Sequence, residues 1–135
     1  PTVQMEDDII LCDNFVEKCE SAIARTPNTV IQFFSRRKAD LVVGSRMETG
    51  SKFLMHQCYY LPAGMASAIH EYSIWYEQYC EDGMTSPNDW VTRDFFKQNR
   101  ISYFVHIPNL VDHRESVSLI DSRRSSKRQS YTFEP

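Results

Sequence analysis

The sequence predicts one α/β domain in which helices flank a mixed β-sheet. Segments rich in β-branched and aromatic residues alternate along the chain with segments whose apolar residues recur at helical spacing. Their order is strand, helix, strand, strand, helix, helix, strand, which is typical of a layered α/β fold. The chain has 135 residues, about the size of one domain, and 41% of them are hydrophobic, enough for a core.

Four stretches have the composition of strands. The first is short and partly apolar, the second (TVIQFF) is β-branched and aromatic, the third is mixed, and the last (ISYFVHI) stops at a proline. They cover residues 2–5, 29–34, 53–61 and 101–107.

Three stretches are predicted to be helices, and each has a start signal. Asp13 is a suitable N-cap for the first, Pro62 suits the first turn of the second, and Ser86 caps the third. The helices are expected over residues 13–25, 62–80 and 86–99. Two polar stretches between these elements, residues 35–40 and 44–50, are predicted to be loops, and the second a mobile one.

The chain changes character after Pro108, where it becomes polar and rich in serine. We expect the α/β domain to occupy residues 1–121, incomplete at its N-terminal side, and a basic, flexible tail to occupy residues 122–135. That tail contains the run RRSSKR, in which Arg123 and Arg124 come first.

Composition excludes several classes of protein. The net charge is -3, so no global basic character indicates nucleic-acid binding, and no apolar run reaches the ~20 residues of a membrane span. The four cysteines form no CxxC pair and match no zinc module, which predicts free, buried thiols in a reducing compartment, the cytoplasm. The motifs GxxxxGK[ST], GxGxxG, GxSxG and HExxH are absent.

Three consecutive acids, Glu6, Asp7 and Asp8, follow the first predicted strand. Alternate residues of an extended segment point the same way, so Glu6 and Asp8 are expected to share a face. Their oxygens suit hard cations such as Mg²⁺ or Mn²⁺, which keep open positions for a substrate's phosphates. The alternative interpretation is a solvated acidic turn that caps the following helix.

Two further side chains are candidates for chemistry. His113 lies between Asp112 and Arg114 just after the last strand, where an imidazole could act as a third metal ligand. Asp89 falls in the first turn of a predicted helix, where the helix dipole keeps a general base ionised. The alternatives are a surface histidine bonded to a neighbour and a simple capping carboxylate.

Four pieces of the sequence, in this order, resemble bacteriophage-type glycosyltransferases of the GT-A class. An apolar strand ends in EDD and is followed by ILCDNF and a helix; QCYYLPAGMASAI then gives a strand, a proline and a helix. An aspartate-containing turn, SPNDW, comes next, and IPNLVDHRESVSLI followed by RRSSKRQSYTF closes the chain. Together the pieces cover nearly the whole chain, and the PNLVDH…SL…RR portion is the most distinctive.

The resemblance implies transfer of a sugar from a nucleotide-diphosphate donor, with Mn²⁺ or Mg²⁺ bridging the donor's two phosphates. It implies that Asp8 and His113 bind the metal ion and that Glu6 or Asp7 contacts the ribose or the donor sugar. Asp89 takes the place of the general base of inverting members. The resemblance also implies that Arg123 and Arg124 clamp the pyrophosphate from a flexible lid.

Two departures from the family pattern bear on this assignment. Many relatives carry a pair of acids where this chain has Asn88 and Asp89, so one carboxylate of the base motif is absent. A GT-A domain also places one or two βα units before its acidic motif, and only five residues precede Glu6 here. We therefore expect the nucleotide base to be bound by a preceding segment, or the exposed sheet edge to pair with another copy of the chain.

Three functions stay open at this point. The first is the glycosyltransferase, located in the host cytoplasm if phage-encoded, with modified DNA or a cell-envelope glycan as acceptor. The second is a non-catalytic α/β binding or interaction module. The third is a metal-dependent phosphoesterase or nuclease, which would need more carboxylates than the chain places nearby.

Overall fold

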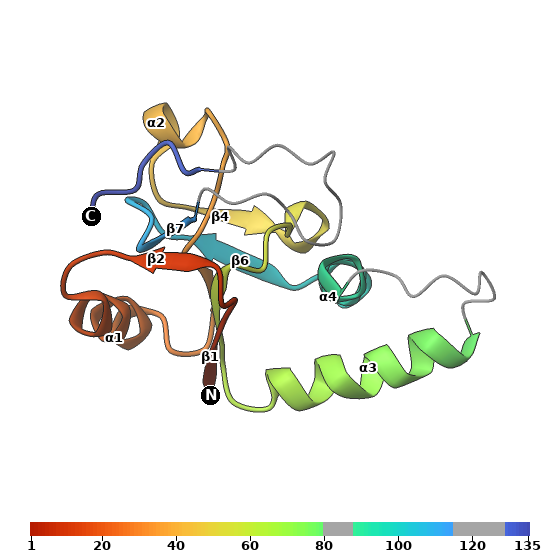
Figure 1. The fold of residues 1–135 in the computed structure, drawn as a ribbon. Coiled ribbons are helices and arrows are strands. Elements are labelled where there is room, and N and C mark those ends of the chain that lie inside the picture. The colour runs from red at the N-terminus through yellow and green to blue at the C-terminus, as the bar shows by residue number, and fades with distance from the viewer. Residues whose placement is uncertain (80–87, 115–128) are drawn as a thin grey trace.

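The structure is a computed structural model that describes residues 1–79, 88–114 and 129–135 (Figure 1). The strands are β1 (Thr2–Met5), β2 (Ile9–Leu11), β3 (Val30–Gln32), β4 (Arg46–Thr49), β5 (Cys58–Leu61), β6 (Ser102–Val105) and β7 (Val111–His113). The helices are α1 (Phe15–Arg25), α2 (Asp40–Val43), the 3₁₀ helix η1 (Gly50–Lys52), α3 (Met65–Tyr79) and α4 (Asn88–Gln98).

The strands form a five-stranded mixed sheet and a separate two-stranded one. The order in the larger sheet is β1-β5-β3-β6-β4, in which β3 and β6 are parallel and the other neighbours are antiparallel. The smaller sheet pairs β2 with β7, with Ile9 opposite His113. Figure 1 shows α1 beside β2 on one side of the molecule and α3 and α4 on the other. The prediction of a mixed α/β fold is therefore confirmed.

Two apolar clusters pack against the larger sheet. One contains Phe33, Phe34 and Tyr60 and is covered by α1. The other surrounds Phe53, whose ring meets those of Phe96 and Tyr103 edge-on at centroid distances of 4.8 and 4.9 Å. Edge-on pairs at such distances add to the stabilisation from burial. Phe53 thus joins η1, α4 and β6 in one core.

The prediction that residues 44–50 form a mobile loop is wrong. Residues 46–49 form β4, which pairs antiparallel with β6, and η1 begins at Gly50. The inward positions of β4 are Arg46 and Glu48, whereas Met47 is exposed. Because charged residues occupy the buried side, the alternation of this strand is the reverse of the usual one.

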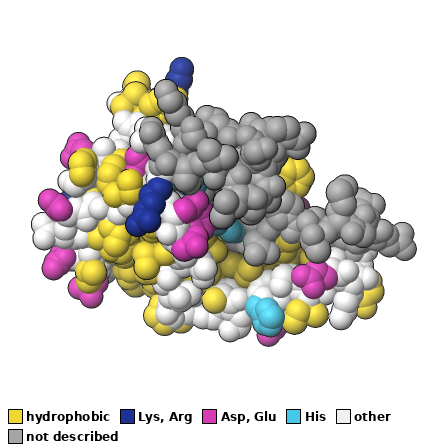
Figure 2. Space-filling view, viewed as in Figure 1, with side chains coloured by type: hydrophobic (Ala, Val, Ile, Leu, Met, Phe, Trp, Pro, Cys, Tyr) yellow, Lys and Arg dark blue, Asp and Glu magenta, His cyan; other side chains and the backbone are white. Residues whose placement is uncertain are grey.

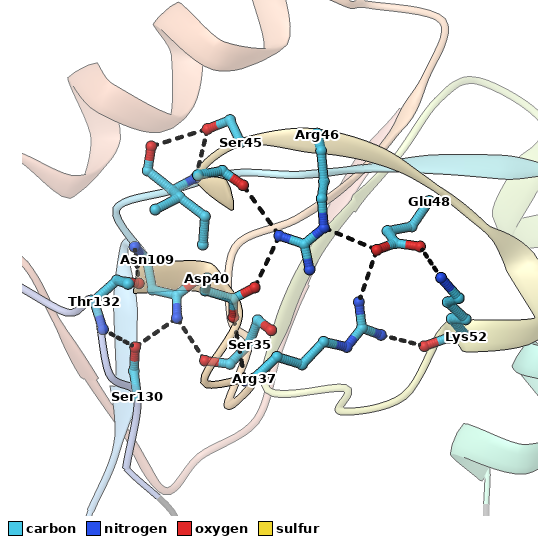
Figure 3. Close-up of polar contacts among 12 residues, drawn as sticks. Ser35, Arg37, Asp40, Ser45, Arg46, Glu48, Lys52, Asn109, Ser130 and Thr132 are labelled. Carbon is cyan, nitrogen blue, oxygen red and sulfur yellow. Dashed lines mark hydrogen bonds and ion pairs between the residues drawn. The ribbon is translucent and has the colours of Figure 1, made fainter. Parts of the chain in front are cut away.

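An ion network makes this burial of charge tolerable. Arg46 contacts Asp40 and Glu48 at 2.9 and 2.8 Å, and Lys52 and Arg37 contact Glu48 at 2.8 and 3.7 Å (Figure 3). The Asp40 carboxylate is 1% exposed, so its partner Arg46 compensates a charge that would otherwise be buried alone. The network fastens the residues after β3 to β4 and η1.

Two simpler predictions concern thiols and membrane spans. Cys12, Cys19 and Cys58 are free and buried, as predicted, and Cys80 lies outside the described residues. In the part of the chain that the structure describes, no helix has both the length and the apolar character that crossing a membrane requires.

Candidate metal and substrate site

The candidate residues gather at one edge of the larger sheet, the edge that is formed by the ends of its strands and not by an outer strand. β1 and β3 both run antiparallel to β5, and β6 runs parallel to β3, so β1, β3 and β6 end at the same edge. In open α/β sheets, ligands bind beyond the carboxyl ends of the strands. The segments that leave or enter this edge are residues 6–8, 33–37, 54–57 and 106–110.

Asp8 and His113 are 105 positions apart in the sequence, yet their side chains meet. Oδ2 of Asp8 lies 2.9 Å from Nε2 of His113. The β2–β7 sheet brings them together, because Ile9 is opposite His113 and the backbone N–H of Arg114 donates to the carbonyl of Asp8 at 2.9 Å. Figure 2 shows Asp and Glu side chains near the middle of the face that it presents.

The hydrogen bonds of His113 define which ring nitrogen carries hydrogen. Nδ1 lies 2.6 Å from the carbonyl oxygen of Arg114, which only accepts, so Nδ1 is the donor. Nε2 lies 2.9 Å from Oδ2 of Asp8 but has no hydrogen-bond partner among the described residues. Oδ1 of Asp8 is likewise buried without a partner. An imidazole nitrogen and a carboxylate, both common metal ligands, therefore lie next to each other without a hydrogen bond between them.

This geometry fits a divalent cation. Two ligands at right angles, each ~2.1 Å from an octahedral Mg²⁺, are about 3.0 Å apart. A ligating histidine typically donates its other ring N–H to a backbone carbonyl, as His113 does to Arg114. Within the described ranges, no group of three His, Cys, Asp or Glu residues could hold a metal ion, so the described part of the chain offers two ligands here. Mg²⁺ commonly takes only one or two protein carboxylates and completes its shell with waters and substrate phosphates.

Glu6 and Asp7 take different directions from Asp8. Glu6 is tied to Gln57 twice: its carboxylate accepts from Gln57 Nε2 at 3.0 Å, and its backbone N–H donates to the Gln57 carbonyl at 3.0 Å. Burial of Tyr59 raises the pKa of its hydroxyl to about 12, and the charge of Glu6 contributes to this rise. Asp7 is exposed. The structure therefore joins Asp8 to His113 and Glu6 to Gln57 and Tyr59.

Asp89 lies in the first turn of α4 and is partly buried, as predicted. It is close enough to His56 for its negative charge to act on that imidazole. The His56 ring packs against Phe53 and Tyr59 at centroid distances of 5.5 and 5.0 Å, and its Nε2 is buried without a partner among the described residues. His56 thus packs on Tyr59, and the charges of Asp89 and Glu6 act on His56 and Tyr59 respectively.

Protein stability is expected to depend on pH through His56. Burial lowers the pKa of His56 from its ordinary 6.5 to about 4, which the charge of Asp89 only partly opposes. The unfolded chain therefore takes up a proton first, so this contribution to the unfolding free energy is complete above pH 6.5 and is lost as the pH falls toward 4. Between pH 7 and pH 5 the loss is about 2 kcal/mol.

Urea unfolding of the wild type and His56→Phe at both pH values measures this effect. The variant keeps the ring packing, and its loss of stability should be smaller by about that amount. His106, whose pKa burial also lowers, provides a background common to both proteins. An equal loss in the two proteins would contradict the assignment to His56.

The residues after the undescribed range 115–128 also contact the site. Oδ1 of Asp112 accepts from the backbone N–H of Ser130 at 2.7 Å and from that of His113 at 2.9 Å. Asn109 Nδ2 donates to the hydroxyl of Ser130 at 2.6 Å. Arg123 and Arg124 lie outside the described residues, but the residues on both sides of that range bond to the strand that carries His113.

Sequence reasoning missed His56 and Gln57. They stand between the predicted loop and β5 in a stretch, MHQ, without a motif. The only signal was their place just before a strand that starts at the edge where β1 ends and Glu6 follows. Comparisons with protein-family models, with curated proteins and with solved structures gave no match to this chain.

Proposed function

We propose that this protein is a metal-dependent glycosyltransferase that moves a sugar from a nucleotide-diphosphate donor to an acceptor hydroxyl, and that its fold corresponds to the C-terminal part of a GT-A domain. The observation that carries the proposal is the Asp8–His113 contact at 2.9 Å. These two residues come from the acidic motif and from the PNLVDH portion, the most distinctive part of the resemblance, and their positions in the sequence do not require them to meet.

The pair Asp8 and His113 would hold Mn²⁺ or Mg²⁺. The metal ion, when bound, supplies positive charge to the donor's two phosphates, which leave as a nucleoside diphosphate. With two protein ligands, most of the coordination shell is left to water and those phosphates. This distribution suits a metal that binds with its substrate better than a structural metal, which is enclosed by protein ligands.

The other candidate residues have roles consistent with their positions. Glu6, held by Gln57, and the exposed Asp7 would contact the ribose or the donor sugar. Asp89 would take the proton of the acceptor hydroxyl while the oxygen of that hydroxyl forms a bond to the anomeric carbon of the donor sugar. Arg123 and Arg124 would place cations near the departing diphosphate, where charge develops.

The position of β1 as an outer strand of the larger sheet supports the GT-A interpretation. Among the described residues, β1 has a strand neighbour on one side only, β5. An edge strand with unpaired backbone groups is a template for further pairing. We propose that a βα segment that binds the nucleotide base, or a second copy of the chain, pairs there.

Calorimetric titration of the protein with Mn²⁺, with and without UDP, tests the proposal. If metal and diphosphate share one site, UDP should strengthen Mn²⁺ binding at least about tenfold, and Mn²⁺ should strengthen UDP binding by the same factor. Ca²⁺, which prefers longer bonds and more oxygen ligands, serves as the comparison ion. The absence of binding, or Mn²⁺ binding that UDP leaves unchanged, would contradict the proposal and favour a non-catalytic module.

A further inference from the structure

A cavity opens at the same edge of the sheet. It holds about 350 Å³, at the small end of the range of ligand pockets. Its lining joins the segment after β3 to the segment before β5, and consists of Ser35, Arg36, Arg37, Leu54 and Met55. We call it the Arg36 pocket. None of these residues belongs to the candidate metal site.

Buried amides hold both walls of the Arg36 pocket. Gln32 and Asn109 are each 1% exposed. Gln32 Nε2 donates to the backbone carbonyls of Leu54 and Met55, and Asn109 Nδ2 donates to that of Ser35 at 2.7 Å. Walls fixed by interior hydrogen bonds give a pocket that exists before a ligand arrives, which lowers the entropic cost of binding.

Met55 has an unusual backbone for its residue type. Its φ is +78°, in the left-handed region that a residue with a long side chain seldom adopts. Such conformations persist where the surrounding structure enforces them, and they cluster at ligand sites. Gln32 Nε2 donates to the carbonyl of Met55 at 3.2 Å, so the backbone at this position is tied to β3.

The two arginines of the pocket differ in their partners. Arg37 lies 3.7 Å from Glu48 and donates to the carbonyl of Lys52 (Figure 3), and it also donates to the hydroxyl of Tyr103. Arg36 is partly buried and makes no hydrogen bond or ion pair that the described residues provide. A guanidinium on a pocket wall without a carboxylate partner is suited to a bidentate phosphate contact.

The Arg36 pocket lies within a short substrate's length of Asp8 and His113. Asn109, which bonds to Ser35, precedes His113 by four residues, of which three form β7. Four extended residues span about 13 Å. One molecule could therefore reach from the pocket to the metal site.

We propose that the Arg36 pocket binds a terminal phosphate group of a small substrate, separately from the diphosphate at the metal site. Arg36 makes the contact, and Leu54 and Met55 pack against the body that carries the phosphate. The identification of this molecule as the sugar acceptor rests on the proposed function. The anion site itself does not.

Metal-free titrations with inorganic phosphate, glucose 6-phosphate and glucose test this inference. The first two probes should bind, and glucose should not. Arg36→Gln should weaken both at least about tenfold, the effect of one charged hydrogen-bonded contact. Tighter binding of glucose 6-phosphate identifies a sugar phosphate as the ligand, and equal affinities identify the free ion.

The matched control is Lys38→Gln, which removes the same charge two residues away, from a side chain that is exposed and outside the lining. It should change phosphate affinity less than about twofold. Equal weakening by both variants, or none by Arg36→Gln, would overturn the proposal. The proposal would also be overturned if an oligothymidylate without terminal phosphates bound as tightly as these probes and its binding depended on Arg36. Mn²⁺ and UDP binding should be unchanged in Arg36→Gln, so failure here is distinguishable from failure of the metal site.

Discussion

Asp8→Ala and His113→Ala are each expected to weaken Mn²⁺ binding, measured by calorimetry in the presence of UDP, by at least about 100-fold. Loss of supporting partners around a metal ligand already costs roughly 10–100-fold. Removing one of two direct ligands should cost more, since the remaining atom cannot replace the missing bond. The double variant should bind no worse than the weaker single one, because both residues serve one ion.

Asp13→Ala is the control for lost charge. Asp13 is exposed and lies in the same acidic stretch, five residues after Asp8. It should change the Mn²⁺ affinity less than about twofold. Since the buried His113 is 1% exposed, His113→Gln provides a less disruptive second variant if the alanine protein fails to fold.

A plain ion pair between Asp8 and His113 would behave differently. Each single variant would then lower the free energy of unfolding, and neither would alter metal binding, because there would be none in the wild type. Wild-type Mn²⁺ affinity in Asp8→Ala would place the ion elsewhere. Both results would reject the two-ligand site.

Much of the fold follows from local pattern. The strands at residues 30–32 and 102–105 lie inside the predicted β-branched and aromatic runs, and α3 lies inside the predicted helix 62–80. In the two strands the apolar pattern agrees with the final burial, so local preference and tertiary structure coincide. In α3, by contrast, no residue is fully buried, and Ile74, Trp75 and Tyr79 are exposed. Local pattern also places Glu6 directly after β1 and Asp89 in the first turn of α4.

β4 and β7 could not be predicted from local pattern. β4 buries Arg46 and Glu48, which only their ion partners make acceptable, and those partners lie in other segments. β7 is three residues long and exists through its pairing with β2, about a hundred positions earlier. Such short strands carry little intrinsic signal, because cross-strand neighbours determine them.

The candidate site was predictable in part for the same reason. Asp8 and His113 belong to stretches with a recognisable motif. His56 and Arg36 can be identified as candidate site residues only from the residues that surround them in the folded chain. Burial of His56 against Phe53, and the lack of a described partner for Arg36, are properties of the folded chain. No spacing in the sequence indicates either.

Gly50→Ala is expected to lower the free energy of unfolding by about 3 kcal/mol or more. A Cβ at Gly50 would lie 2.5 Å from the carbonyl oxygen of Ile101 and 2.5 Å from Cβ of Phe96. It would also lie 2.8 Å from the backbone carbon of Phe96. Because two of these three atoms are backbone, the strain cannot be relieved by a side-chain rotation, and overpacking costs at the high end of its usual range.

Gly64→Ala separates this clash from the general cost of replacing glycine. Gly64 has a φ of +80° but open space around its Cβ position, so alanine there should cost only about 1–2 kcal/mol. Urea unfolding of the two variants measures the difference, and equal stabilities would show that η1 and α4 are not in this close contact.

Gly50→Ala is expected to affect the candidate site as well, because the clash lies between η1 and α4, the two helices next to it. η1 leads into Phe53 and His56, and α4 carries Phe96 in its core and Asp89 at its start. Separating η1 from α4 would move His56 away from Asp89 and open the Phe53 cluster to water. The variant should therefore also lose part of the stability difference between pH 7 and pH 5 that the burial of His56 produces. The absence of a side chain at Gly50 is thus the condition for the close contact between η1 and α4.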